Sequence, residues 1–244
     1  MEVLTYYIPA TRRNRPGIPI DGPRWVTIHD TGNPSRGADA LAHASYLLSP
    51  TAENLPASWH FTVDDRRIIQ HLPMTEVGWH AGDGRTPGGG NMASIGVEIC
   101  EHADGDRDGA EDFAARLVAA LVTQLGTIEG IRQHYDWSGK DCPRVLRGRP
   151  NGWKDFLRAV GRYREAIDLD RPSDWAREAW DWGIDLGITD GRRPRDTATR
   201  EEIVTMLYRA RGSGMSVVWE PETGNRMEQI EAEVEALREE LRRL

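Results

Sequence analysis

The chain has 244 residues, of which 39% are hydrophobic and 29% charged, and its formal net charge is −8. No apolar run approaches the roughly 18 residues that a membrane-spanning helix requires, and the basic residues form no stripe of the kind that binds nucleic acid phosphates. The composition therefore indicates a globular protein with one sizeable core and a smaller part, and it excludes membrane and nucleic acid partners.

The first residues, MEVLTYYIPATRRNRPG, lack the charged start, apolar stretch and cleavage site of a secretory signal. We therefore expect synthesis in the cytoplasm without a signal peptide. Cys100 and Cys142 are too few for a disulfide scaffold, and in the cytoplasm they stay reduced.

Strand and helix signals alternate in the first two thirds of the chain. WVTIH predicts a strand that ends at His29, and ADALAHASYLL predicts a helix over 38–48. HFTVDDRRIIQHL predicts two strands within 60–72, separated by a turn at its two adjacent aspartates.

The stretch SIGVEIC, residues 94–100, alternates with the period of a strand. Ile95, Val97 and Ile99 share one face, which we expect to enter the core. Glu98 lies on the opposite face, so its carboxylate should point elsewhere.

Two amphipathic helices are predicted next. Residues 110–126 place apolar side chains four residues apart and end on a capping glycine, and residues 151–167 repeat the pattern with Asn151 as the N-cap. Together these signals predict an α/β domain with a mixed central β-sheet flanked by helices.

The composition shifts near residue 170, which marks a domain boundary. A Trp-rich helix is predicted within 173–191 and a second helix over 199–210, where Thr199 and Glu202 form a capping box. A charged helix over 226–244 ends the chain. We therefore expect a small all-α module and a C-terminal helix after the α/β domain.

One set of residues has the composition of a catalytic zinc site. Such sites take three protein ligands from His, Cys or carboxylate, and His29, His134 and Cys142 are a candidate set. Spacing alone is a weak signal, because five other histidines compete and a single His or Cys is more often a core residue.

Six short motifs follow one another along the chain: VTIHDTGN, SWHFTVDD, IIQHLP, GWHAGDG, SIGVEIC and WSGKDCPR. Together they resemble the N-acetylmuramoyl-L-alanine amidases of the type 2 amidase and peptidoglycan-recognition fold, especially endolysins of phages of Gram-positive bacteria. The resemblance implies a catalytic domain over residues 1–168, peptidoglycan as substrate, host cell wall lysis, and Zn²⁺ bound by His29, His134 and Cys142.

The resemblance also implies two catalytic residues. Glu98 corresponds to the family's catalytic glutamate, and Lys140 to the lysine that stabilises the tetrahedral intermediate. The chemistry requires both roles, because amide hydrolysis needs a base for the attacking water and a cation for the developing oxyanion. A half-buried ion pair is the structural alternative for Glu98, and a non-catalytic peptidoglycan-binding module is the alternative for the whole protein.

One residue departs from the family pattern. Some amidases of this fold carry a tyrosine in GYHF near the metal, whereas this chain has Trp59 in SWHF. No phenol can therefore assist the reaction, and we expect catalysis to depend more strongly on Glu98. Trp79 and His80 in GWHAGDG are predicted to contact the sugar or the stem peptide, and packing under a loop is their alternative.

Two glycine-rich stretches resemble ligand sites without completing them. DGDRDG copies the first half of a calcium loop, but its twelfth position is Ala115 instead of a glutamate. GDGRTPGGGN lacks the Lys of a phosphate-binding loop, so we expect only a flexible loop.

The region after the boundary, residues 172–212, resembles a single S-layer homology repeat. Such repeats bind secondary wall polymers, normally as several copies, so a packing appendage or a dimer module is the alternative. The segment 226–244 spaces apolar residues by threes and fours, which favours a short coiled coil that makes a homo-oligomer. A helix packed on its own domain is the alternative there.

Overall fold

The computed structural model of the protein describes residues 3–20, 22–169, 171–192, 194–195 and 198–212. The chain divides into two compact units, Met1–Asp170 and Arg171–Leu244. Among the described residues, no helix has both the length and the apolarity needed to cross a bilayer.

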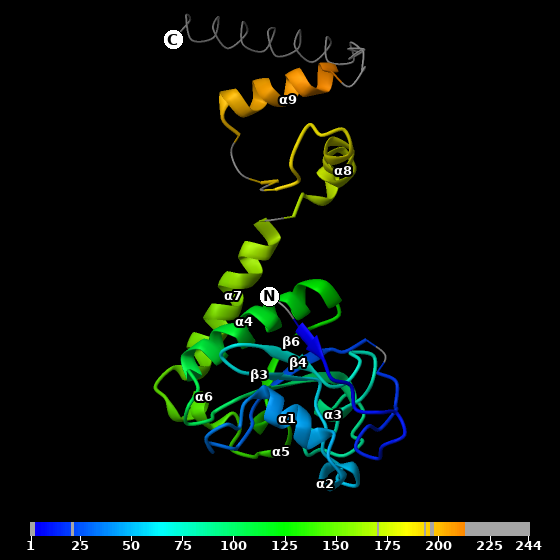
Figure 1. Ribbon diagram of the computed structural model, residues 1–244, viewed down its shortest axis with the longest axis vertical. Coiled ribbons are helices and arrows are strands. Elements are labelled where there is room, and N and C mark those ends of the chain that lie inside the picture. Colours follow the sequence, from blue (N-terminus) through cyan, green and yellow to red (C-terminus); the bar gives the residue numbers. More distant parts are fainter. Residues whose placement is uncertain (1–2, 21, 170, 193, 196–197, 213–244) are drawn as a thin grey trace, which may run out of the picture. The chain divides into compact units, whose positions relative to one another are not determined.

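The first unit is built on a six-stranded mixed sheet (Figure 1). Its strand order is β1-β4-β3-β5-β2-β6, in which β3 and β4 pair antiparallel and all other neighbours pair parallel. The strands are β1 (Val3–Thr5), β2 (Trp25–Asp30), β3 (Phe61–Val63), β4 (Ile68–Gln70), β5 (Ser94–Ile99) and β6 (Gly130–Gln133). The mixed sheet predicted from the sequence is confirmed.

Helices cover both faces of this sheet (Figure 1). Side chains of α4 and α7 enter the main core on one face, while α1 packs on Ile69 and Cys100 on the other. The helices of this unit are α1 (Ala40–Leu47), α2 (Pro50–Glu53), α3 (Gly90–Ala93), α4 (Arg107–Leu125), α5 (Tyr135–Ser138), α6 (Arg144–Gly148) and α7 (Gly152–Leu169).

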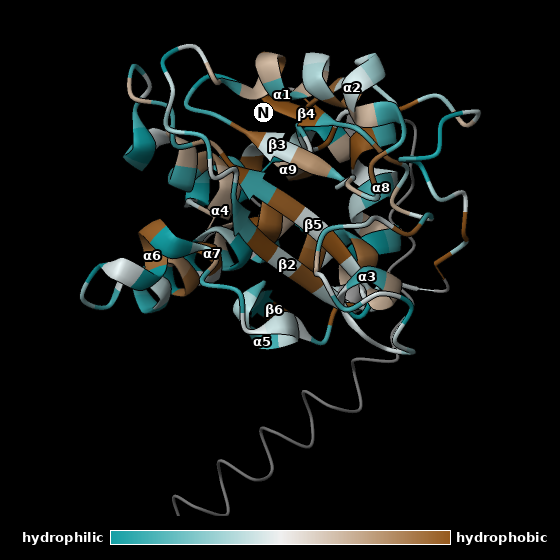
Figure 2. Cartoon of the chain, turned by 90° about the horizontal axis from the view of Figure 1, so that it is seen from below, coloured by the Kyte–Doolittle hydropathy of each residue, from teal (hydrophilic) through white to brown (hydrophobic). Residues whose placement is uncertain are grey.

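The two central strands divide their side chains between the core and a polar face. Val26 and Ile28 of β2 are fully buried in the main core, as are Ile95, Val97 and Ile99 of β5, so the alternation predicted for residues 94–100 is confirmed. Figure 2 shows the hydrophobic colour along most of β2 and β5. The residues between them on each strand therefore face the other side of the sheet.

The long helix α4 begins earlier than the sequence pattern predicted. Asp106 is its N-cap and accepts a hydrogen bond from the Asp108 amide at 3.1 Å, so the aspartates of DGDRDG start a helix. Ala115 lies fully buried in the core. The helix ends at Gly126, whose φ of 65° is the left-handed conformation that glycine adopts without strain.

The second unit contains the 3₁₀ turn η1 (Asp174–Ala176) and the helices α8 (Arg177–Asp185) and α9 (Arg200–Gly212). The capping box of α9 is confirmed, because the Thr199 amide donates to Glu202 at 2.8 Å and the Glu202 amide donates to the Thr199 hydroxyl at 3.2 Å. Gly187 follows α8 with a φ of 66°. The predicted helix over 226–244 lies outside the described residues.

Buried histidines make the first unit sensitive to acid. Loss of hydration lowers the pKa of His60 to about 4 and that of His71 to about 3, from an ordinary value of 6.5. Between pH 6.5 and pH 4 the unfolded chain binds protons that the folded chain excludes. The contribution of these histidines to the free energy of unfolding should therefore be fully present above pH 6.5. Below that pH it should fall by about 1.4 kcal/mol per pH unit for each histidine. Urea unfolding across this range measures the slope. It should become shallower in His71→Gln, and an unchanged slope in that variant would contradict the assignment.

Candidate active site

The polar face of the sheet brings distant residues together at the carboxyl ends of three parallel strands. His29 of β2 lies directly opposite Glu98 of β5 in the strand register. Ile28 pairs with Gln133, the last residue of β6, so His134 follows beside His29. Ligands bind preferentially at such edges of α/β sheets.

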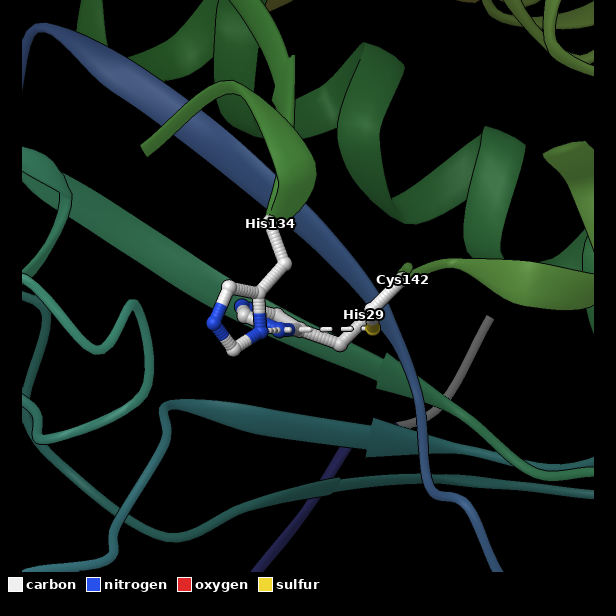
Figure 3. Close-up of side chains that lie close together, drawn as sticks. All are labelled: His29, His134 and Cys142. Carbon is white, nitrogen blue, oxygen red and sulfur yellow. Dashed lines mark hydrogen bonds between the residues drawn. The ribbon is translucent and has the colours of Figure 1, made fainter. Parts of the chain in front are cut away.

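The three predicted ligand side chains converge there (Figure 3). The Nδ1 atoms of His29 and His134 are 2.9 Å apart, and the Cys142 Sγ lies 3.9 Å from the His29 Nδ1. One ligand atom from each residue lies within 4.8 Å of the others. The fold thus brings together three residues that are distant in the sequence, and their donor atoms point at one position.

Burial sets the protonation of these groups. His29, His134 and Cys142 are 1%, 6% and 4% exposed. Loss of hydration lowers the pKa of His29 well below its ordinary value and that of His134 to about 4, and it raises the pKa of the Cys142 thiol to about 12. Both imidazoles are therefore neutral, which is the form that binds a metal.

The loop that carries Cys142 is fixed by Asp30, a residue that the sequence analysis missed. The Asp30 amide donates to the Cys142 Sγ at 3.4 Å. The Asp30 carboxylate is 2.5 Å from the guanidinium of Arg107 and accepts from the Val145 amide at 2.7 Å. This buried ion pair ties the end of β2 to α4 and to the segment that follows the cysteine.

Glu98 lies at the same edge with its carboxylate toward the ligands. Its Oε1 is 3.9 Å from the His29 Nδ1. Burial raises the pKa of Glu98 well above its ordinary value, and the positive charge of Lys140 acts against this shift. In the described part of the chain, the Glu98 Oε2 has no hydrogen-bond partner. The fold thus leaves this buried carboxylate oxygen of Glu98 unsatisfied.

A cleft of about 1120 Å³ opens over this edge. Every predicted site residue except the buried His29 lines it. The lining includes Trp79, His80, Glu98, His134, Lys140 and Cys142. Lys140 is exposed, and the guanidinium of Arg85 lies 5.8 Å from the ring centre of Trp79.

His80 has a contact that its sequence context did not reveal. Its Nδ1 lies 3.0 Å from the Nε2 of His29, on the side of the His29 ring that faces away from Cys142. Only 8% of His80 is exposed, and burial lowers its pKa well below the ordinary value. The ring is therefore neutral and offers only part of its surface to the cleft.

Comparison with known proteins places these residues within one family. Residues 19–145, which include all of the predicted site residues, match the family model described as N-acetylmuramoyl-L-alanine amidase. The chain is 45% identical over 162 residues to the amidase XlyA of Bacillus subtilis (strain 168), covering 66% of this chain and 52% of XlyA. It is 46% identical over 155 residues to the amidase CwlH of the same organism, covering 63% and 59% of the two chains.

Two solved structures also match about two thirds of the chain. The catalytic domain of XlyA matches with a TM-score of 0.59 and 44% identity over 66% of this chain and 99% of that domain. PlyL matches with a TM-score of 0.56 and 32% identity over 66% and 97%. The chain spans a little over half the length of the two curated relatives. Since the matched family model and these structures cover the unit that holds the cleft, the chain belongs to the N-acetylmuramoyl-L-alanine amidase family.

Proposed function

We propose that the protein is a zinc-dependent amidase of the endolysin type, which hydrolyses the bond between N-acetylmuramic acid and L-alanine in bacterial peptidoglycan. The convergence of His29, His134 and Cys142 below a large cleft is the observation that carries this proposal. The names of the amidases XlyA and CwlH support the same substrate.

The donor set fits zinc. Two neutral imidazoles and one cysteine form a three-ligand set of the kind used by catalytic zinc sites, which keep a fourth position open. Hard cations such as Ca²⁺ and Mg²⁺ prefer oxygen ligands, which these three side chains do not supply. A bound zinc ion would lower the pKa of a water molecule and polarise the scissile carbonyl.

Glu98 is the proposed general base. Its carboxylate lines the cleft beside the ligands and has one oxygen without a partner among the described residues. It can therefore take a proton from the attacking water and deliver it to the departing nitrogen of alanine. Lys140 carries its positive charge at the same cleft, where it can stabilise the oxyanion that develops on the carbonyl oxygen.

Trp79 and His80 are the proposed substrate contacts. Both line the cleft, and the Trp79 indole offers an apolar face of the kind that packs on sugar rings. The contact of His80 with substrate is restricted to the small part of its ring that reaches the cleft. Trp59 also lines the cleft, but its Nε1 donates to the Thr62 hydroxyl at 2.7 Å, so Glu98 remains the proposed base.

The competing proposal is a peptidoglycan-binding module without activity. Cys142 favours the enzyme, because binders that resemble these amidases commonly lack the thiolate ligand. Incubation of the zinc-loaded protein with purified walls separates the two, and we expect new alanine amino groups. Binding to the walls without new amines would support the module, and new reducing sugars would indicate a glycosidase.

For the second unit we propose wall binding through the repeat-like segment 172–212. The capped helix α9 and the Gly187 turn support the resemblance to an S-layer homology repeat. Secondary wall polymers are the proposed ligands. A single repeat is fewer than such modules normally use, so we also propose that 226–244 gathers several copies in a homo-oligomer and raises their local concentration.

Truncation after residue 224 tests this arrangement. The full chain should scatter light as a dimer or trimer at micromolar concentration and should sediment with walls, because linked repeats bind with avidity. The truncated chain should be monomeric and should sediment more weakly. A monomeric full chain would contradict the oligomer, and equal sedimentation of the two chains would contradict the avidity.

A further inference from the structure

The contact between His29 and His80 has a chemical consequence for the proposed zinc site. The His29 Nδ1 faces the other two donors, at 2.9 Å from the His134 Nδ1 and 3.9 Å from the Cys142 Sγ. If this nitrogen binds the metal, the proton of the neutral ring must lie on Nε2. That Nε2 is 3.0 Å from the His80 Nδ1, which must then be the acceptor.

Hydrogen bonds fix the main chain around His80. The Asn91 Oδ1 accepts hydrogen bonds from the amides of His80 and Ala81, at 2.8 and 2.7 Å. The main-chain N–H of Asn91 in turn donates to the Asp83 carboxylate at 3.1 Å. A side-chain amide oxygen thus fixes the two successive backbone groups that carry the His80 ring.

A glycine in the sheet makes room for the ring. A Cβ atom at Gly96 would lie 2.8 Å from two ring atoms of His80, which is closer than such contacts allow. A larger residue at position 96 would therefore force the His80 ring to shift. The sequence of the strand and the position of the histidine are therefore coupled.

The neighbouring residue supports the second ligand. The main-chain carbonyl of Ala81 accepts a hydrogen bond from the His134 ring. The site where a Cβ of Gly82 would stand is 3.4 Å from the His134 Nε2, so this turn runs directly along the ring. Residues 80 and 81 thus contact both ligand histidines on the sides that face away from the donor cluster.

We propose that His80 is a positioning residue of the metal site, which accepts the Nε2 proton of His29 and thereby fixes the tautomer and ring orientation of that ligand. Metal-bound histidines commonly donate to a carboxylate, a carbonyl or water. Here a neutral imidazole takes that place, and the Ala81 carbonyl does the same for His134. The proposal rests on the zinc site of the proposed function.

Variants at position 80 test the role through metal affinity. His80→Phe keeps a ring of similar shape without the acceptor, and it should weaken zinc binding by about 10- to 100-fold, as loss of such outer partners does. His80→Asn places an amide oxygen near the former Nδ1 and should restore much of the affinity. His71→Phe, which replaces another buried histidine, is the matched control and should keep the wild-type affinity. Chelator competition gives the dissociation constants, and the absorption bands of the Co²⁺-loaded proteins report the ligand geometry.

Nitrogen NMR of the zinc-loaded wild type gives a test that needs no variant. We expect a protonated Nε2 on His29 and an unprotonated Nδ1 on His80. A proton on the His80 Nδ1, or wild-type zinc affinity in a folded His80→Phe protein, would overturn the positioning role and leave the zinc site standing. A wild-type protein that binds no zinc would contradict the proposed function itself and this inference with it.

Discussion

Replacement of Cys142 by serine should abolish both zinc binding and amide hydrolysis. A serine hydroxyl is a much poorer zinc ligand than the sulfur of cysteine, and Cys142 is buried beside the two histidines that complete the donor set. We expect zinc affinity to fall by more than the roughly 10- to 100-fold that loss of an outer partner typically costs. Metal analysis after dialysis measures the loss of zinc, and amine release from walls measures the loss of hydrolysis.

The second cysteine provides the control. Cys100 is buried in the small cluster under α1 with Ala40, Ala44 and Ile69, and it is not one of the three convergent donors. Cys100→Ser should lose some stability, because it places a hydroxyl among apolar groups, but it should keep one zinc ion per chain. Retained zinc and activity in Cys142→Ser would show that the ligand set is wrong.

Glu98→Gln should separate metal binding from chemistry. Glutamine keeps the size of the side chain but cannot accept a proton, so the rate of hydrolysis should fall by about 10²- to 10⁴-fold. Zinc content should stay at the wild-type level, because the carboxylate is not one of the three convergent donors. Single-turnover amine release and metal analysis of the same sample give both numbers.

Glu129→Gln removes an equivalent charge at a distance. Glu129 forms an exposed ion pair with Arg24, which is worth little to stability, so this variant should keep the wild-type rate. If Glu98→Gln hydrolyses walls at a rate close to that of Glu129→Gln, another group is the base. Loss of zinc in Glu98→Gln would indicate that the glutamate supports the metal instead.

The sequence predicted the parts of the fold whose periodicity is strong. Residues 94–100 alternate over a full strand, and the two faces they predicted are the core and the cleft. Residues 110–126 repeat apolar positions over several turns and form most of α4. In both cases one face is buried along its whole length, so many residues contribute to the hydrophobic pattern.

Short and exposed elements could not be predicted in this way. β1 has three residues and β6 has four, and none of them belongs to the fully buried class. Their pairing with β4 and β2 depends on backbone hydrogen bonds that any sequence can make. Yet β6 places His134 beside His29. The assembly of the site therefore depends on a strand that has almost no recognisable sequence pattern.

The identity of the ligands was equally hard to derive from spacing. Six of the seven histidines are buried, and burial alone does not distinguish a ligand from a core residue. His60 and His71 lie in the same sheet region, but their nitrogens bind a backbone carbonyl and a threonine hydroxyl. Only the family motifs separated His29 and His134 from the others, and they gave no sign that His80 contacts a ligand.

Hydrolysis of purified peptidoglycan in ¹⁸O-labelled water, followed by mass spectrometry of the products, tests the proposed activity most directly. An amidase must add one ¹⁸O atom to the lactyl carboxylate of N-acetylmuramic acid and release stem peptides with an unlabelled, free L-alanine amino group. We expect this labelling with the zinc-loaded protein and its absence with Cys142→Ser. Intact muropeptides, or label at the reducing end of a sugar, would contradict the proposed reaction.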